Sequence, residues 1–363
     1  MSNRRIFYAC QAVGIGGDGV AVANVTEIRG LQSVGINTTF NLEQVFEIGM
    51  ISIYENIENI PDVEVTLEKV LDGFPLIYHL ATSTGSTTST LVGRSNAKAS
   101  LALSIVNDTF EAASGTPNTT CFISGCFVSQ VSYKVAVDGN ATESVTLVAN
   151  NKTWSTGTTW TADFQPQDVP GTGANPGSTW DADPYLDTAN AGQIASGIAR
   201  RQHVDMVEST FPKCIDGIDG SGKNTLDTVL KCYKTSFQSF STSANLGREQ
   251  ILELGRKAPY FRYVKFPVAV TCELAVLTKN GDQIGATEAG TLGNGNNLSN
   301  ETIKLVLTEG TVINLGSKNK LQSANYQGGG TDGGNATTTY SFQTFNDFNV
   351  QHSQDPNTDL RPV

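Results

Sequence analysis

Apolar and polar residues alternate along several stretches of the chain, a pattern typical of β-strands. The run 63–68 (VEVTLE) alternates strictly, so its apolar side chains fall on one strand face and its glutamates and threonine on the other. An apolar run, 45–54 (VFEIGMISIY), comes before it, and 56–62 (NIENIPD) carries turn residues. The region from about 41 to 72 is therefore predicted to be a long β-hairpin with its turn at 56–62.

A second hairpin is predicted between about 124 and 149. Residues 129–137 (SQVSYKVAV) and 143–148 (ESVTLV) flank Asp138-Gly139-Asn140, and Asp-Gly between alternating segments is a strong hairpin signal. Further strands are expected within 260–277, 302–315 and 337–345, and the Gly-rich segment 328–336 reads as a polar loop.

One segment has the pattern of an amphipathic helix. Residues 246–257 (LGREQILELGRK) place Leu246, Ile251 and Leu254 near one face, and Pro259 follows. Weaker helices are expected at about 187–208 and 94–107. The predicted fold class is mainly β with a flanking α-helix, long hairpins and a large insertion.

A change in composition divides the chain into three parts. From 151 to 185 the chain is rich in Thr, Gly, Pro and Asp, and it contains Trp154, Trp160 and Trp180. Tryptophan contributes large buried areas, so this stretch is expected to pack locally. The predicted division is a first core part at 1–150, an insertion at 151–235, and a second core part with a C-terminal tail at 236–363.

The chain contains few charged residues, and its net charge is negative. Of its 363 residues only 16% are charged, and the formal net charge is -11. Proteins normally bind a nucleic-acid backbone through basic patches, so this acidic chain is a poor candidate for binding DNA. Acidic residues concentrate between 41 and 72, a segment that contains eight carboxylates and a single base, Lys69. They are Glu43, Glu47, Glu55, Glu58, Asp62, Glu64, Glu68 and Asp72.

The six cysteines and three histidines match no metal-binding or disulfide framework, so we expect free thiols and no metal or cofactor. The N-terminus lacks the apolar length of a secretory signal, and no apolar run is long enough for a membrane-spanning helix. Synthesis and folding in a reducing cytoplasm are the corresponding expectation.

The segment 217–225 (GIDGSGKNT) is similar to a phosphate-binding loop, but Asn224 stands where a hydroxyl would ligate magnesium. A surface turn followed by a short helix is the favoured interpretation. His79, His203 and His352 lie near no recognisable nucleophile motif, and no catalytic residue is assigned. Carboxylate pairs suited to glycoside hydrolysis stay open as an alternative.

Several segments together resemble the tail tube proteins of contractile-tailed bacteriophages. They are Phe46–Gly49, Ile53–Glu58, Pro61–Gly73, Gly255–Lys257, Arg262–Val268 and the block from Asn314 to Asn325. The resemblance covers roughly half of the chain, and the insertion has no clear counterpart in it.

This resemblance implies a β-sandwich or barrel-like core with a flanking helix. It also implies a non-enzymatic protein of the virion tail, made and assembled in the host cytoplasm, that forms rings, expected to be hexameric, which stack into a tube for DNA ejection. Its implied partners are other copies, tail sheath and baseplate proteins, and genomic DNA that passes without specific binding. The candidate lumen-facing acidic residues are Glu47, Glu55, Glu58, Asp62, Glu64 and Glu68. The candidate inter-subunit basic residues are Arg248, Arg256, Lys257, Arg262 and Lys265. The alternatives are a baseplate or head component, or a glycan-binding adhesin that uses the insertion tryptophans.

Overall fold

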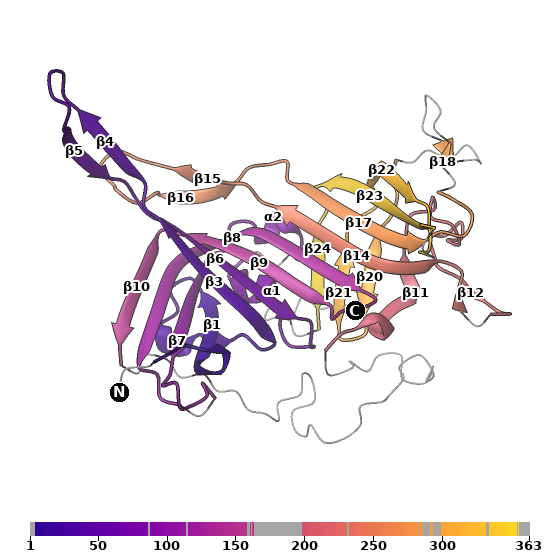
Figure 1. Cartoon of the computed structure of the whole chain (residues 1–363), viewed down its shortest axis with the longest axis horizontal. Coiled ribbons are helices and arrows are strands. Elements are labelled where there is room, and N and C mark those ends of the chain that lie inside the picture. Colours follow the sequence, from indigo (N-terminus) through magenta and orange to yellow (C-terminus); the bar gives the residue numbers. More distant parts are fainter. Residues whose placement is uncertain are drawn as a thin grey trace.

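The computed structural model describes residues 4–85, 88–113, 115–157, 160, 162, 198–230, 232–282, 284–285, 291–292, 299–331, 334–353 and 355. Most of these residues lie in or between antiparallel β-strands, so the predicted mainly β fold is confirmed. Two packed sheets form the body, and two slender hairpin arms extend from it toward the same side (Figure 1).

Twelve of the described strands form the larger sheet. They are β1 (Gln11–Gly17), β2 (Thr26–Glu27), β3 (Leu31–Thr39), β6 (Asp62–Val70), β7 (Ala99–Ile105), β8 (Thr119–Ala136), β9 (Thr142–Ala149), β10 (Asn151–Thr156), β14 (Ser236–Asn245), β17 (Ala269–Leu277), β22 (Lys320–Gln327) and β23 (Thr337–Phe345). Eight of them run side by side in the order β3-β6-β9-β8-β14-β17-β23-β22.

Strand β8 joins the two halves of the larger sheet. Its first half pairs with β7 and β10, and its second half pairs with β9 and β14. Gly125, near the change of partners, has a φ of +65°, a conformation that glycine adopts without steric cost. One strand of 18 residues can therefore serve both halves of the sheet.

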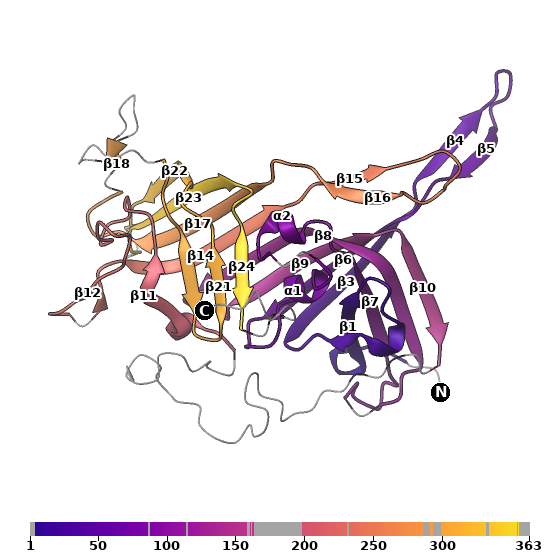
Figure 2. The same ribbon diagram turned by 180° about the vertical axis from the view of Figure 1, so that it is seen from behind.

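The smaller sheet packs against the inner face of the larger one (Figure 2). It consists of β11 (Val204–Thr210), β20 (Lys304–Leu307), β21 (Thr311–Asn314) and β24 (Asn349–His352), in that order. One buried cluster combines Leu67, Tyr133 and Leu274 of the larger sheet with Leu305 and Ile313 of the smaller one. This shared core makes the body a two-layer β-sandwich.

The α-helices of the described residues are short. They are α1 (Ile77–Ala81) and α2 (Leu91–Arg94), and 3-10 turns occur at Tyr8–Cys10, Val22–Asn24 and Arg201–His203. Helices α1 and α2 both lie beside the large sheet at one end of the sandwich (Figure 2). Neither reaches the length or apolar content that crossing a membrane as a helix requires.

The flanking helix predicted at 246–257 is wrong. Arg248–Ile251 is instead strand β15, which pairs with β16 (Phe261–Val264), and a turn connects the two strands. Gly247 and Gly255 both have positive φ, which interrupts helical geometry at each end of the segment. The spacing of its apolar residues suited a helix, but pairing with a distant strand decided the structure.

The two weaker helix predictions fail as well. The segment 94–107 contains β7, which pairs with β1 and β8 and is buried on both faces. Its large apolar residues Leu101, Leu103 and Ile105 alternate with small ones, a strand pattern that the helix prediction overlooked. In the segment 187–208, the described residues 198–208 form a 3-10 turn and the start of β11, and the rest lies outside the described residues.

The long hairpin near residues 41–72 exists, but its turn was predicted in the wrong place. Strands β4 (Leu42–Phe46) and β5 (Ile53–Glu58) pair with each other, and the turn is at 47–52, where Gly49 has a φ of +97°. The predicted turn 56–62 instead contains the end of β5 and the start of β6. One ribbon thus runs from β3 into β4 and returns through β5 into β6.

The other strand predictions are confirmed. The turn at Asp138-Gly139-Asn140 joins β8 to β9, β16 and β17 occupy 260–277, and β23 spans 337–345. Small hairpins, β12 (Leu226–Asp227) with β13 (Cys232–Tyr233) and β18 (Ile284–Gly285) with β19 (Thr291–Leu292), complete the described strands.

Candidate functional site

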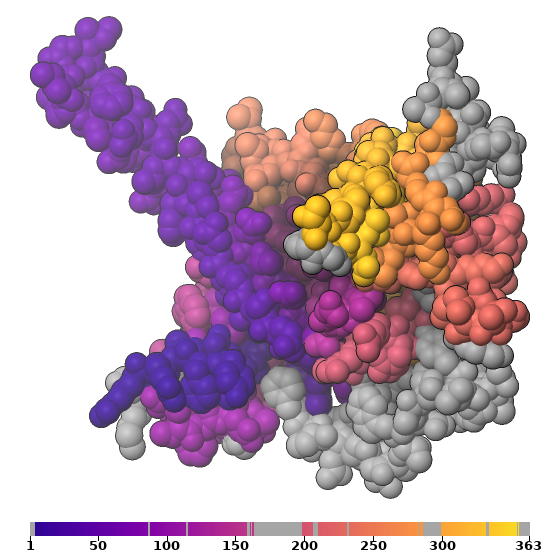
Figure 3. Space-filling view, turned by 45° about the vertical axis from the view of Figure 1, so that its right-hand side comes forward, coloured from indigo at the N-terminus to yellow at the C-terminus, as the bar shows by residue number. Residues whose placement is uncertain are grey.

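The β4–β5 arm exposes large apolar side chains along its whole length. They are Phe40, Leu42, Phe46, Ile48, Met50, Ile51, Ile53, Tyr54 and Ile57. Ile48 and Ile51 at the tip are fully exposed, and the space-filling view shows the arm projecting well clear of the body (Figure 3). A two-stranded ribbon is marginally stable alone in water, and an apolar patch of this extent marks an interaction surface.

The same arm carries exposed carboxylates and no cation between residues 40 and 60. Glu47 lies in the turn, and Glu55 and Glu58 lie on β5. Glu43 on β4 belongs to the same exposed acidic set. Three of the candidate acidic residues are therefore on a projecting arm and not on the sheet itself.

The β15–β16 arm resembles the first arm in hydrophobicity, but it exposes charges of both signs, including the carboxylates Glu249 and Glu253. Its exposed apolar side chains are Ile251, Leu252, Leu254, Tyr260, Tyr263 and, just beyond β16, Phe266. Arg256, Lys257 and Lys265 are exposed on or beside it, and Arg256 forms a surface ion pair of 3.1 Å with Glu253. These three cations stay candidates for contact between subunits.

The other two basic candidates are engaged within the chain. The Arg248 guanidinium donates to the carbonyl oxygens of Val128 and Ser95, both at 2.7 Å, and burial lowers the pKa of Arg248 to about 10. Arg262 is buried and donates from Nη2 to Asp62 Oδ1 at 2.6 Å. Arg248 and Arg262 therefore fix the β15–β16 arm to the body, and their predicted contact with a neighbouring subunit stays a prediction.

Asp62 joins the roots of both arms. Its carboxylate accepts hydrogen bonds from Arg262 on β16, Gln250 on β15 and Asn41 at the base of β4. Partial burial acts to raise the pKa of Asp62, but the hydrogen bonds from Arg262 and Asn41 and the charge of Arg262 together outweigh it, so the pKa is lowered. Asp62, a predicted lumen residue, thus holds the arm junction together.

Glu64 and Glu68 lie on the solvent face of β6, as the alternation predicted. This face of the larger sheet is dominated by hydroxyl and amide side chains. One cross-strand row consists of Ser33, Glu68, Ser144, Ser132, Ser243, Thr271 and Gln343. The exposed charges on the strands of this face include the carboxylates Glu64, Glu68 and Glu273 and the cations Lys134 and Lys320. The face is therefore polar but nearly neutral.

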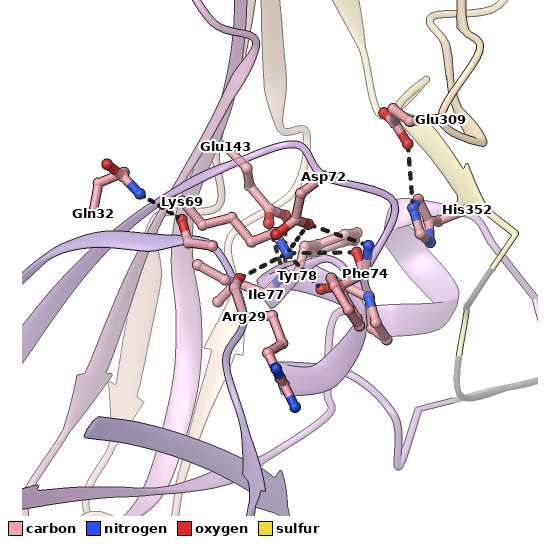
Figure 4. Close-up of polar contacts among 12 residues, drawn as sticks. Arg29, Gln32, Lys69, Asp72, Phe74, Ile77, Tyr78, Glu143, Glu309 and His352 are labelled. Carbon is pink, nitrogen blue, oxygen red and sulfur yellow. Dashed lines mark hydrogen bonds and ion pairs between the residues drawn. The ribbon is translucent and has the colours of Figure 1, made fainter. Parts of the chain in front are cut away.

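A buried ion network fixes α1 against the larger sheet (Figure 4). Glu143 accepts from the backbone N–H groups of Ile77, at 2.7 Å, and Tyr78, at 3.1 Å, and from the Tyr133 hydroxyl at 2.8 Å. Burial raises the pKa of Glu143, and the positive charge of Lys69 and these hydrogen bonds oppose the rise. The carboxylate thus supplies the acceptors that the start of α1 needs.

Lys69 is fully buried beside this carboxylate. Its Nζ donates to Asp72 at 2.8 Å and to the carbonyl oxygen of Arg29 at 3.0 Å. Sequence reasoning missed both ions, although a signal was present. Lys69 continues the inward-facing positions of β6, Glu143 begins those of β9, and the two are direct cross-strand partners.

A second buried cluster surrounds two of the histidines. His79 Nδ1 lies 3.4 Å from Asp355 Oδ2, which also pairs with Arg94, and His352 Nε2 lies 3.3 Å from Glu309 Oε2. Burial, followed by the charges of Arg94 and His352, lowers the pKa of His79 well below its ordinary value. All of these groups are almost completely inaccessible to solvent, so the cluster joins α1, α2 and the C-terminal segment and offers no access to a substrate.

The phosphate-loop-like segment forms a closed turn. Asp219 accepts hydrogen bonds from the backbone N–H groups of Ser221, at 2.8 Å, and Lys223, at 3.0 Å. The Asp219 carboxylate therefore already accepts the hydrogen bonds of the backbone N–H groups that a bound phosphate would require. The predicted surface turn is confirmed, whereas the short helix predicted after it is wrong, because β12 follows.

The tryptophans have different environments. Trp160 is buried against Gly14 and Val25 in a small cluster with Ala12 and Ala102, so it belongs to the core of the first 150 residues. Trp154 on edge strand β10 is 52% exposed, and Trp180 lies outside the described residues. The buried ring of Trp160 offers no stacking surface to a glycan.

The cysteines are free thiols, of which Cys232 is exposed and the other five are buried. Burial raises the pKa of Cys126 and of Cys214 to about 12, which keeps both thiols protonated.

No protein-family model and no curated protein matches the sequence. Among solved structures, part of the chain is similar to a chain of the anti-feeding prophage baseplate, with 13% identity and a TM-score of 0.32, covering 43% of this chain and 98% of that one. It is also similar to a chain of the anti-feeding prophage cap, with 14% identity and a TM-score of 0.32, covering 43% and 95%. A third similar chain comes from a sheath-tube complex of an extracellular contractile injection system, with 16% identity and a TM-score of 0.31, covering 42% and 93%.

Proposed function

We propose that this chain is a non-enzymatic structural protein that assembles with copies of itself into rings, and that stacked rings form a tail tube that conducts DNA. Within the proposal, copies of the chain are its principal partners, with sheath and baseplate proteins outside the tube. The observation that carries the proposal is the pair of projecting arms, whose large apolar side chains are exposed among the residues that the structure describes.

The arms favour assembly because each is a two-stranded ribbon, and such a ribbon is only marginally stable in water when no further strand or chain covers it. Strands β4 and β5 pair only with each other among the described strands, as do β15 and β16. A second chain that covers them would bury their apolar surface and gain roughly 25 cal/mol for each Å² removed from water.

The edges of the larger sheet support the same proposal. Strand β3 at one edge and β22 at the other each have a single partner among the described strands. Monomeric proteins usually protect such edges with charges or proline. Strand β3 has no charged residue and no proline, and β22 has only Lys320. The two open edges are of similar length and belong to one sheet. Pairing of β3 in one copy with β22 in the next could therefore continue the sheet from copy to copy.

The solvent face of the larger sheet suits the wall of a conduit. Its rows of serine, threonine, asparagine and glutamine carry few cations, so contact with DNA would release few counterions and bind it weakly. Glu64 and Glu68 add local repulsion of phosphates within this largely neutral face. Ring number, tube formation and DNA passage are all parts of the proposal.

Electron microscopy and sedimentation of the purified chain over a range of concentrations test the proposal. We expect rings or hollow tubes that become more abundant as the concentration rises. DNA added at physiological salt should not bind to them. A chain that stays monomeric at every concentration would overturn the proposal.

A further inference from the structure

We infer that the acidic β4–β5 arm of one copy docks on the cation-bearing β15–β16 arm of the next copy, with an apolar side chain of its tip in a pocket that the turn end of that second arm forms with the larger sheet. The inference rests on the proposed self-assembly, and it names the two surfaces that meet.

Charge decides which arms can pair. The β4–β5 arm carries Glu43, Glu47, Glu55 and Glu58 without a cation, so two copies of it would bring like charges together. The β15–β16 arm exposes the cations Arg256, Lys257 and Lys265 and the carboxylates Glu249 and Glu253, so three positive charges minus two negative ones leave one positive charge. Contact between unlike arms replaces the repulsion between two acidic arms with attraction to these cations, because complementary charges set partner and register.

Both arms supply the apolar surface that such a contact needs. Ile48 and Ile51 at the tip of the β4–β5 arm are fully exposed, and so is Leu254 at the tip of the β15–β16 arm. Glu47 lies beside the apolar tip of one arm, and Arg256 and Lys257, with Glu253 paired to Arg256, lie beside the apolar tip of the other. This arrangement is that of an interface with an apolar centre and a charged border.

The turn end of the β15–β16 arm forms a pocket of about 160 Å³ with the larger sheet. Residues from the arm and from the edge of the larger sheet line it, among them Lys98, Phe127, Asn151, Tyr260 and Phe261. This volume accommodates one large side chain. Anchors of this kind in pockets dominate the energy of protein interfaces.

The wall of the pocket is ordered before any partner arrives. The rings of Phe127 and Phe261 meet edge to face at 4.9 Å, and Lys98 Nζ lies 5.0 Å from the centroid of Phe261. Arg248 covers Phe127 at 5.2 Å and is itself held by backbone carbonyl groups. A rigid aromatic wall beside a lysine favours a partner that presents an apolar side chain next to a carboxylate, and the tip sequence Glu47-Ile48 does so.

The two surfaces lie on different parts of one chain, so the contact is heterologous. Each copy offers one acidic arm and one cation-bearing arm, and each contact leaves one of each free at its ends. Such contacts build a closed ring or an open filament.

Charge exchange tests the pairing directly. Variant one is Glu43→Lys with Glu55→Lys, which share one face of the β4–β5 arm; variant two is Arg256→Glu with Lys257→Glu. Each alone should need at least about tenfold more protein to assemble. Equal mixtures of the two should assemble again, because each then supplies the arm that complements the other.

Two further pairs of variants test whether a change in assembly comes from the arms and the pocket or from charge substitution in general. Glu111→Lys with Asp138→Lys changes two exposed carboxylates in turns outside both arms, and it should assemble as the wild type does. Asn151→Trp should fill the pocket and block assembly, whereas Asn151→Ala should leave assembly nearly unchanged. Circular dichroism of each variant verifies that the body is folded.

The outcomes separate this inference from the proposed function. If the wild type assembles and variants one and two assemble equally well alone, the pairing of the arms is wrong while self-assembly stands. If the mixture fails although both variants are folded, the pairing is also wrong. If the wild type stays monomeric and its apolar tip binds phosphatidylcholine vesicles instead, both the inference and the proposed function are overturned.

Discussion

Asp62 and Arg262 stand 200 residues apart in the chain, yet Arg262 Nη2 donates to Asp62 Oδ1 at 2.6 Å. The bond connects the start of β6 with β16, so it ties the root of one arm to the other. Arg262 is buried, while the Asp62 side chain is 43% exposed. A pair of predicted functional residues, one acidic and one basic, is in this way satisfied within a single chain.

Removing the carboxylate should loosen both arms. Asp62→Ala leaves the buried Arg262 guanidinium with Asn150 as its remaining side-chain partner, and we expect a loss of about 1–2 kcal/mol in the free energy of unfolding. Limited proteolysis at the arm roots should also become faster. Urea unfolding measures the first effect, with Glu58→Ala, an exposed arm residue, as the control. An unchanged unfolding midpoint would show that the pair contributes nothing.

The buried Glu143 is expected to be among the most sensitive positions. Glu143→Ala leaves the Tyr133 hydroxyl and two backbone N–H groups of α1 without their acceptor and removes the anion beside Lys69. We expect a loss of about 3–5 kcal/mol. Glu143→Gln keeps one oxygen acceptor and should lose less. Thermal unfolding of the two variants compares them, and equal losses would contradict the role of the hydrogen bonds.

His79 should make the fold sensitive to acid. Above its ordinary pKa of 6.5 the imidazole is neutral in both the folded and the unfolded state, so it adds no dependence on pH. Below 6.5 the unfolded state binds a proton that the buried ring refuses, and stability falls by up to about 1.4 kcal/mol per pH unit from this group.

Urea unfolding between about pH 7.5 and pH 5 measures this slope. His79→Asn should lower stability at neutral pH but should flatten the slope, because the titrating group is gone. Protonation of His203, whose pKa is also lowered by burial, acts in the same direction and remains in both proteins. An identical slope in the variant would exclude His79 as a source.

Trp160 should prove to be a core residue. A Cβ added at Gly14 would lie 2.6 Å from Trp160 Cζ2, so Gly14→Ala should cost about 1–3 kcal/mol through overpacking. Combining it with Trp160→Leu should cost less than the sum of the two single changes. Gly139→Ala, at a turn position with open space, serves as the control. Additive costs would mean that the two residues do not compete for the same space.

The strand content of the chain was readable from its sequence because alternation of period two reports a sheet with one buried face. Segments 63–68 and 129–149 fold as predicted, with Glu64 and Glu68 outward. The alternation of large and small apolar residues in β7 was overlooked, and the prediction failed at 246–257, where apolar spacing suits a helix as well as a strand. Local pattern cannot settle the second case, because the pairing partner β16 lies outside the segment.

The sequence by itself determined the fold class, the acidic region 41–72, the Asp-Gly-Asn turn and the mainly strand-forming composition. Only the tertiary structure decided which charged side chains remain exposed and which form hydrogen bonds and ion pairs inside the molecule. Arg248, Arg262 and Asp62 are engaged at the arm roots, whereas Glu55, Glu58, Arg256 and Lys257 remain exposed. The reason is physical: a charge finds its partner through the packing of segments up to 200 residues apart, and no local pattern encodes that distance.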